Sequence, residues 1–309
     1  MIGFILILVG AAIFPGIILR VKAVASGRKG AGLWQPWKDM WRSVRKGSVY
    51  STTSSFVFQI ATPIYFTGIW VAALLVPFAD QASVLSFEGD VVVFAYLLAL
   101  GRFLMIIAAL DTGSPFEGMG ANREAFYATL VEPAFFIFVG SLAMFTGYTS
   151  FSNIYQHLFF ENYISYLIGV FATYLLVQMA MVENSRLPVD DPTTHLELTM
   201  VHEVMILDNS GVDLAMIQGG SALKFSIYGM LVANFFLQPH ALLSSSPVAI
   251  GMNAVLFLGI QVLFAVAVGL LESFRARFKM NRNPQFIMTL SAVGIIIFFT
   301  VLLLTQKIA

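Results

Sequence analysis

Ionisable side chains gather in one stretch of this chain, and they are of the types that take up and release protons. The stretch runs from Glu183 to Gly211 and reads ENSRLPVDDPTTHLELTMVHEVMILDNSG. Its ionisable residues are Glu183, Arg186, Asp190, Asp191, His195, Glu197, His202, Glu203 and Asp208. Carboxylates and imidazoles can pass protons to one another when they are held within reach. An apolar chain has no packing reason to gather so many of them, so the stretch is a candidate functional segment, and the simpler alternative is a solvated loop between two membrane helices.

The same stretch carries signals for a helix of its own. Asp191 is followed by Pro192, and an acidic cap before a proline is a typical helix start. Gly211 is a plausible stop. Between them, His195 and His202 fall on one helical face. We expect an amphipathic helix that docks on the membrane domain and turns its polar face to a partner or a water-filled chamber.

Two further charges lie within apolar segments, where a charge is costly and is usually functional. Arg102 lies nine residues before Asp111, and Glu132 lies nine residues after Arg123. Nine residues of helix span about 13 Å, close to half of the ~30 Å bilayer core. In an antiparallel hairpin the two side chains would reach the same depth. We expect Arg102 and Glu132 to be partners or members of one buried polar network, whether the pair serves transport or only structure.

Further carboxylates and a lysine could extend this network. Glu124, Glu183 and Glu272 fall at the cytoplasmic ends of neighbouring apolar segments, and Lys224 lies shortly inside another. Lys224 could reach the interface or pair with a carboxylate. A file of carboxylates with water between them can relay protons, although the sequence does not give their order.

The elements that must position these groups are membrane helices. The 309 residues are 58% hydrophobic and 11% charged, and the mean hydropathy is +0.83. These values are typical of an integral membrane protein. We predict an all-α, polytopic fold in a single membrane domain of residues 1–309. Its eight spans are 2–24, 57–79, 89–110, 124–147, 163–183, 219–238, 248–272 and 285–306.

Composition also excludes several kinds of site. The chain has no cysteine, which excludes disulfides, iron–sulfur clusters and thiolate metal sites within it. The spacing of its four histidines does not match the usual metal motifs. The formal net charge is zero, so nothing suggests nucleic acid. We therefore expect no cofactor or metal in this chain, and any redox chemistry would belong to another subunit.

Lys and Arg residues predict the orientation, because cytoplasmic loops are enriched in them. Most of the 17 cations fall in or next to the loops at about 25–56, 111–123, 184–218 and 273–284. These loops are predicted to be cytoplasmic, with both termini outside. In the first of them, Trp34, Trp37 and Trp41 share a helical face opposite basic residues, which indicates a helix in the membrane interface. It is either a simple anchor or also braces a docked subunit or borders a lateral opening.

The loop from Asp111 to Glu124 is rich in glycine and proline. Such a composition predicts a fixed irregular turn. We expect the turn to end at a helix start that carries Arg123 and Glu124. Its position beside the 183–211 stretch would make both parts of one docking platform, although a simple connection is the alternative.

Two motif regions resemble the family of respiratory complex I subunit 1, a membrane subunit of NADH dehydrogenase, and the related membrane-bound hydrogenase and formate hydrogenlyase membrane subunits. The family run GxxRAxxQxxSYE is similar to residues 120–125 with Glu132, and ExxRxPFDLxEAExEL is similar to the run from Glu183 to Leu198. Leu110 to Phe116, Gly120 to Ala125 and Leu130 to Pro133 look like the hydrogenase branch. Val189, Thr193 and His195 depart from the quinone-reducing members where these build the floor of the quinone chamber.

The resemblance implies a membrane anchor for a hydrophilic arm, whose carboxylates begin a proton path toward antiporter-like and other small membrane subunits. The implied partners are a hydrogenase-like large subunit and a small iron–sulfur subunit, which would hold the NiFe centre and the clusters. Mapped here, the relay and its counter-charges are Glu132, Glu183, Asp190, Asp191, Glu197, Glu203, Glu272, Arg102, Arg123, Arg186 and Lys224. The docking residues are Asp111, Glu124, His195, His202, Trp34, Trp37 and Trp41.

The resemblance also implies a place in the plasma membrane of a prokaryote. Three interpretations remain: a coupling subunit of an energy-converting hydrogenase or formate hydrogenlyase, the quinone-chamber subunit of a complex I-type dehydrogenase, and a purely structural membrane anchor. In the second interpretation, a quinone would bind next to the 183–211 stretch.

Overall fold

The computed structural model describes residues 1–79, 81–160, 163–190, 200–237 and 247–308. All regular structure in these ranges is helical, which confirms the all-α prediction. The long helices are α1 (Ile2–Ala25), α3 (Phe56–Leu74), α4 (Asp90–Asp111), α5 (Pro115–Thr146), α7 (Tyr163–Glu183), α9 (Gly211–Phe236), α10 (Pro247–Phe274) and α11 (Asn283–Ile308). Shorter helices are α2 (Gln35–Val44), α6 (Phe151–Gln156), α8 (His202–Met205) and a 3₁₀ turn at Met280–Arg282.

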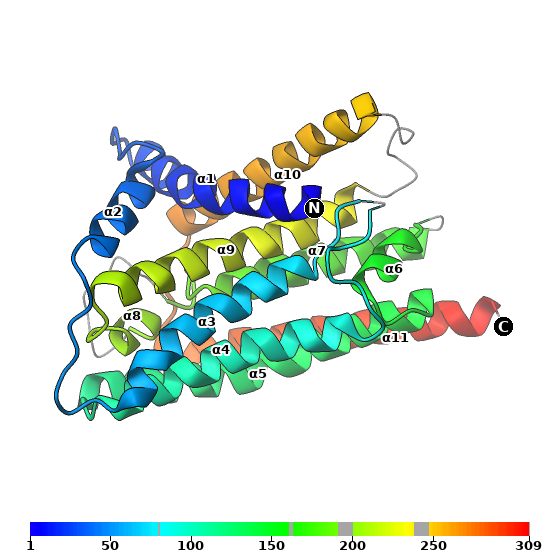
Figure 1. Cartoon of the computed structure of the whole chain (residues 1–309). Coiled ribbons are helices and arrows are strands. Elements are labelled where there is room, and N and C mark those ends of the chain that lie inside the picture. The colour runs from blue at the N-terminus through cyan, green and yellow to red at the C-terminus, as the bar shows by residue number, and fades with distance from the viewer. Residues whose placement is uncertain (80, 161–162, 191–199, 238–246, 309) are drawn as a thin grey trace.

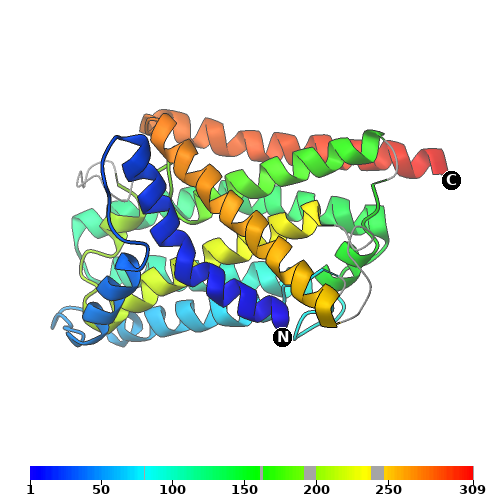
Figure 2. The same cartoon turned by 90° about the horizontal axis from the view of Figure 1, so that it is seen from above.

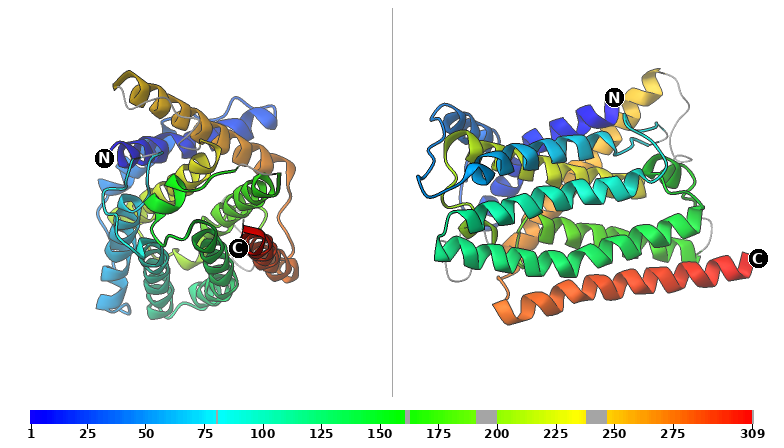
Figure 3. Two further views of the ribbon diagram at one scale, coloured as in Figure 1. Left: turned by 90° about the vertical axis from the view of Figure 1, so that its right-hand side faces the viewer. Right: turned by 60° about the horizontal axis from the view of Figure 1, so that its bottom comes forward.

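The long helices form one elongated bundle. The C-terminus and α6 lie toward one end of it, whereas α2 and α8 lie at the opposite end, and the N-terminus lies at the end of α1 that points away from α2 (Figure 1). Figure 2 shows α1 and α10 on one face, crossing the helices beneath them. Figure 3 shows α11 running along the far side of the bundle beside α5. The end that holds α2 and α8 is the end where the sequence analysis places the cytoplasmic loops.

Seven helices of the described chain are long and apolar enough to cross a membrane: α1, α3, α4, α5, α7, most of α10 and, with the 3₁₀ turn before it, α11. The eighth predicted span, 219–238, falls in α9, whose 26 residues are long enough but do not meet the same hydropathy. A helix surrounded by protein does not need an apolar lipid-facing surface. Most residues of α9 are buried, and it packs against α1, α3, α7 and α10.

The predicted irregular turn at 111–124 is wrong over most of its length. Only Thr112 to Ser114 separate α4 from α5, and α5 begins at Pro115. Ser114 has extended backbone angles at the N-cap, proline is favoured at the first helical position, and Glu117 supplies an acidic first turn. These signals outweigh the glycines at 118 and 120. Arg123 and Glu124 therefore lie inside α5 rather than at its start.

The helix predicted from Asp191 to Gly211 is also wrong in its described part. Residues 191–199 lie outside the described residues, α8 covers only four residues, and a turn follows it. Gly211 is the first residue of α9 rather than a helix stop, and its φ is +56°. At this glycine the backbone of Gly47 approaches so closely that a side chain would collide with its carbonyl oxygen. The segment between α2 and α3 is thus packed onto the start of α9.

Candidate functional site

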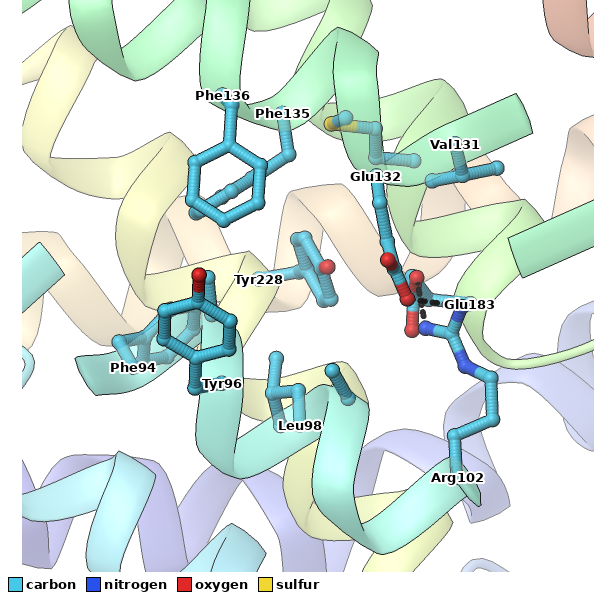
Figure 4. A pocket seen from close by; sticks show the side chains of 13 residues that line it. Phe94, Tyr96, Leu98, Arg102, Val131, Glu132, Phe135, Phe136, Glu183 and Tyr228 are labelled. Carbon is cyan, nitrogen blue, oxygen red and sulfur yellow. Dashed lines mark ion pairs between the residues drawn. The ribbon is translucent and has the colours of Figure 1, made fainter. Parts of the chain in front are cut away.

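Arg102 is the centre of a charged cluster inside the bundle. It extends from α4, and its Nη2 contacts Oε1 of Glu183, the last residue of α7. Its Nε lies 3.8 Å from Oε1 of Glu124, and its Nη1 lies 3.9 Å from Oε1 of Glu132, both on α5. Figure 4 shows the side chains of Glu132 and Glu183 converging on the guanidinium. Three carboxylates from two helices thus surround one arginine.

The expected pairing of Arg102 with Glu132 is present, but it is the loosest of the three contacts. The Glu132 side chain is 44% exposed, whereas the Glu183 side chain is 6% exposed. The carboxylate of Glu183 is therefore the main partner of the arginine, and Glu132 is not buried as expected. Glu124, assigned to docking from the sequence, instead points inward to Arg102, because α5 begins nine residues earlier than predicted.

Lys224 completes the cluster from the central helix α9. Its Nζ lies 3.6 Å from Oε2 of Glu183, as expected for a lysine that pairs with a carboxylate. Glu183 therefore lies between two cations that come from different helices. Tyr228, one turn further along α9, lines the same small cavity with Arg102 and Glu183. Because a buried charge is stable only when it is paired, the cluster holds α4, α5, α7 and α9 in one relative arrangement.

A second buried carboxylate lies toward the other face of the bundle. The Glu272 side chain is fully buried on α10, and its oxygens lie 3.0 Å from Nζ of Lys22 and 3.1 Å from Nη1 of Arg186. The guanidinium of Arg186 also lies 5.3 Å from the ring centroid of Phe225. Lys22 was not among the residues expected from the sequence, because it falls where any basic residue flanking a span would fall.

Asp190 links the segment after α7 to the start of α8 and to the segment between α10 and α11. Its Oδ2 accepts hydrogen bonds from the backbone N–H groups of Val201, at 3.0 Å, and His202, at 3.1 Å. Its Oδ1 lies 2.9 Å from Nη2 of Arg277, in the segment between α10 and α11. The Asp190 side chain is only 1% exposed. The residue therefore connects two predicted cytoplasmic loops rather than pointing into solvent.

Helix α5 contributes three more attachments to the same stretch. Arg123 Nη1 donates to the carbonyl oxygen of Met200 at 2.7 Å. The buried Glu117 accepts a hydrogen bond from the backbone N–H of Asp208 at 3.0 Å. Gly120 lies so close to α8 that a Cβ there would come within 2.5 Å of a Val204 methyl carbon. Glu117 was missed from the sequence, although its place in the first turn of a helix was a usable signal.

His202 and Glu203 line a large cavity at the α2 end of the bundle. The cavity has a volume of about 830 Å³ and is lined by residues of α1, α2, α3, α9 and the segment from Asn184 to Arg186. Burial, followed by the positive charges of Lys224 and Arg102, lowers the pKa of His202 from 6.5 to about 4. The histidine is therefore neutral at neutral pH. His202 lies in the cavity wall, and it interacts electrostatically with Lys224 and Arg102 of the charged cluster.

The remaining residues that the sequence analysis assigned to docking lie in different parts of the structure. Trp34, Trp37 and Trp41 are 59%, 44% and 58% exposed on and beside α2, as expected for an interfacial helix. Asp111 ends α4, and its Oδ2 accepts a hydrogen bond from the backbone N–H of Ser55 at 2.6 Å. Asp191, His195 and Glu197 lie outside the described residues. Among the described residues, no group of three or more His, Asp or Glu could hold a metal ion.

The helical bundle and its candidate spans define a multi-pass membrane protein. The model of the NADH dehydrogenase family matches residues 1–305, and the chain belongs to this family.

Named relatives come from two branches of this family. The chain is 30% identical to hydrogenase-4 component C of Escherichia coli (strain K12), over 75% of this chain and 73% of that protein. It is 26% identical to formate hydrogenlyase subunit 4 of the same organism, over 89% of each chain. It is also 26% identical to a subunit of the NADH-quinone oxidoreductase of Salinibacter ruber, over 58% of this chain and 55% of that one.

A solved structure has the same fold. It is the membrane-bound sulfane sulfur reductase, an archaeal respiratory membrane complex, one chain of which superposes with a TM-score of 0.80. The match covers 96% of both chains at 18% sequence identity.

Proposed function

We propose that this chain is the membrane anchor and proton-coupling or ion-coupling subunit of an energy-converting hydrogenase or a formate-hydrogenlyase-like complex. The observation that carries the proposal is the cluster of Glu124, Glu132 and Glu183 around Arg102 within the spans. Charges inside a membrane are expensive unless they pair, and they usually mark ion pathways. The named hydrogenase-4 and formate hydrogenlyase relatives support the choice of complex.

In this proposal, Arg102 exchanges one carboxylate partner for another when a carboxylate of the cluster takes up a proton. Glu183 holds both Arg102 and Lys224 while it is ionised. A proton that arrived on Glu183 would remove its negative charge, and Arg102 would then bind Glu124 or Glu132 more strongly. Glu132, which is partly exposed on the side of the bundle, would pass the charge to a neighbouring membrane subunit.

Docking of the redox arm would use the end of the bundle that holds α2 and α8. Asp190, Arg123 and Glu117 tie the described 200–208 segment to α5 and to Arg277. A partner that pressed on this segment would act on Asp190, which lies seven residues from Glu183 along the chain. In this proposal, the partners are a hydrogenase-like large subunit and a small iron–sulfur subunit, which hold the redox centres.

The test is a pair of isosteric substitutions in the complex that co-purifies with this chain. Glu183→Gln and Glu132→Gln each keep the shape of the side chain and remove the titratable group. We expect electron transfer to persist while ion translocation into vesicles falls by roughly tenfold or more. Glu88→Gln is the matched control, because Glu88 is exposed in the segment before α4. Undiminished translocation in both cluster variants, with the complex intact, would leave only the anchor function.

A quinone-chamber subunit is the second candidate, and the cavity of about 830 Å³ is the observation that favours it. Nickel content and hydrogen evolution of the purified complex separate the two candidates. Nickel with hydrogen evolution supports the hydrogenase proposal. Quinone reduction without nickel supports the quinone chamber instead.

A further inference from the structure

Tyr65 of α3 is held between two glycines that belong to neighbouring helices. A Cβ at Gly101 of α4 would lie 3.1 Å from Cδ2 of the tyrosine ring, and a Cβ at Gly220 of α9 would lie 2.7 Å from Cε1. Cδ2 and Cε1 lie on opposite edges of the ring, so the two helices close on it from both edges. Tyr65 is also only 5% exposed. Packing therefore fixes the direction in which its hydroxyl group points.

The ring lies beside the charged cluster. The two glycines that hold it come from the helices that supply the cations Arg102 and Lys224. Tyr65 interacts electrostatically with Arg102 and with two of the carboxylates, of which Glu124 has the largest effect. A tyrosine hydroxyl can donate one hydrogen bond. Tyr65 was not among the residues expected from the sequence, because it carries no charge and lies among other aromatic residues in an apolar span.

Glu124 is the carboxylate of the cluster that most needs such a donor. Its side chain is 12% exposed, and its Oε1 lies 3.8 Å from Nε of Arg102, which is too long for a hydrogen bond. The closer contact of the arginine is with Glu183. A buried carboxylate is costly unless it accepts hydrogen bonds. Among the described residues, two cations and two carboxylates act on Glu124: Arg102, Lys224, Glu183 and Asp190.

We propose that Tyr65 is a positioning residue of the charged cluster, whose hydroxyl donates a hydrogen bond to the ionised carboxylate of Glu124. This inference rests on the coupling function proposed above, in which Arg102 exchanges Glu183 for another carboxylate. Glu124 can receive the arginine only if it is still ionised when Glu183 takes up a proton. A hydrogen bond to the charged form of a carboxylate favours that form. Tyr65 therefore keeps Glu124 ready for the exchange.

The test follows the protonation of Glu124 directly. Infrared difference spectra of the intact complex, recorded over a series of pH values, contain a band from protonated carboxyl groups, and the contribution of Glu124 is the part that is lost in Glu124→Gln. Tyr65→Phe keeps the ring and removes the hydroxyl. In this variant we expect the titration of the Glu124 contribution to move to higher pH by about one unit, the effect of one hydrogen bond to a charged group.

Tyr155→Phe is the matched control for this measurement. Tyr155 is 3% exposed, and its hydroxyl donates to the carbonyl oxygen of Leu231 rather than to a carboxylate. Its removal should leave the titration of Glu124 where it is. A titration that is the same in Tyr65→Phe and in the unmodified chain, or the absence of any contribution from Glu124, would overturn the proposal.

Two adjacent glycines of α9 test the same contact through packing. Gly220→Ala places a methyl group against the ring and should reproduce the shift of Tyr65→Phe. Gly219→Ala is its control, because the atom nearest to a Cβ there is Cε2 of Phe66 at 3.4 Å, which is an ordinary contact. Equal titrations in the two glycine variants would contradict the assigned geometry.

Ion translocation into vesicles, measured over the same pH range, separates this inference from the proposed function. The pH profile of translocation in Tyr65→Phe should move together with the infrared titration. If the titration moves and the translocation profile does not, the hydrogen bond is supported and its role in coupling is overturned. If the titration moves while Glu183→Gln and Glu132→Gln translocate normally, the coupling function itself fails and the hydrogen bond remains.

Discussion

At the scale of single residues, Arg102 is surrounded by three carboxylates inside the bundle. It contacts Glu183, Glu124 and Glu132, whereas Lys224 forms its ion pair with Glu183. Removing one partner from a buried ion pair leaves an uncompensated charge, which typically costs about 3–5 kcal/mol. The stability of the bundle and the proposed relay therefore rest on the same side chain.

Substitution of Arg102 should separate these two roles. Arg102→Met should lower the free energy of unfolding by about 3–5 kcal/mol, because Glu183 and Glu124 lose their shared cation. Thermal unfolding of the purified complex in detergent measures this change. Arg45→Met, which removes an arginine that lies over Trp41 at 5.2 Å on the exposed α2 side, is the control and should have little effect. Equal melting temperatures for the two variants would contradict a structural role of the cluster.

His202 predicts how stability depends on pH. Its pKa is lowered from 6.5 to about 4 in the folded chain, first by burial and then by Lys224 and Arg102. Between these values the unfolded chain binds a proton that the folded chain does not bind. The contribution of His202 is therefore complete above pH 6.5 and is lost as the pH falls toward 4.

Melting temperatures on either side of the unfolded-state pKa, at about pH 7.5 and about pH 5, test this dependence. The decrease between the two pH values should be smaller in His202→Gln than in the unmodified chain. The same substitution at His157, an exposed histidine beside Tyr148, should leave the decrease unchanged. A decrease of equal size in His202→Gln would show that other groups account for the pH dependence.

At the scale of elements, α5 packs against α8 between the proposed docking surface and the charged cluster. Gly120 allows α8 to lie against α5, and Arg123 and Glu124 follow within about one helical turn. A side chain at 120 would meet Val204, Val201 and Met205 at once. Since two of the nearest atoms belong to the backbone, α8 itself would have to move.

A glycine pair within α5 provides a matched test of this contact. Gly120→Ala should destabilise the chain by about 1–3 kcal/mol and reduce recovery of the soluble partners with the membrane subunit. Gly118→Ala is the control, because nothing lies within 4 Å of a Cβ at this position. The control should be neutral or slightly stabilising. If both variants retain the partners equally, the α5–α8 contact does not set the docking geometry.

The ion pair of Asp190 predicts a second effect at this scale. Asp190→Asn keeps the shape of the side chain but removes the charge that Arg277 and two backbone N–H groups of the 201–202 segment share. We expect faster proteolytic cleavage near residues 200–208 and little change elsewhere. Asp39→Asn, at an exposed ion pair of α2, is the control. Unchanged cleavage near 200–208 would mean that Arg123 and Glu117 suffice to hold the segment.

These elements also show which parts of the structure could be predicted from sequence. The spans at 2–24, 89–110 and 163–183 match α1, α4 and α7 to within a residue or two, because long apolar runs specify membrane helices directly. Arg102 and Glu132 could be paired because adjacent helices joined by a short turn meet at equal depth. The stronger contact between Arg102 and Glu183 could not be predicted from the sequence, because it depends on how α4 and α7 are rotated relative to each other. The early start of α5 was missed because glycines were given more weight than Ser114 and Pro115.

At the scale of the whole molecule, α9 explains how a membrane bundle can keep charges in its interior. It is the most enclosed of the long helices, and it contributes Lys224 to the cluster and much of the wall of the large cavity. Its position separates the cluster on one side from the cavity on the other.

The placement of the chain ends has a practical consequence for work on the assembled complex. The C-terminus lies at the end of the bundle opposite α2 and α8, and the N-terminus also lies away from them (Figures 1 and 3). The 26 residues of α11 alone correspond to about 39 Å. An affinity tag or an enzyme reporter fused to the C-terminus would therefore stand about the full thickness of the membrane away from the proposed docking surface, and one fused to the N-terminus would also point away from it. Such fusions should leave assembly intact, and an alkaline phosphatase fusion should be active only if the termini face outward.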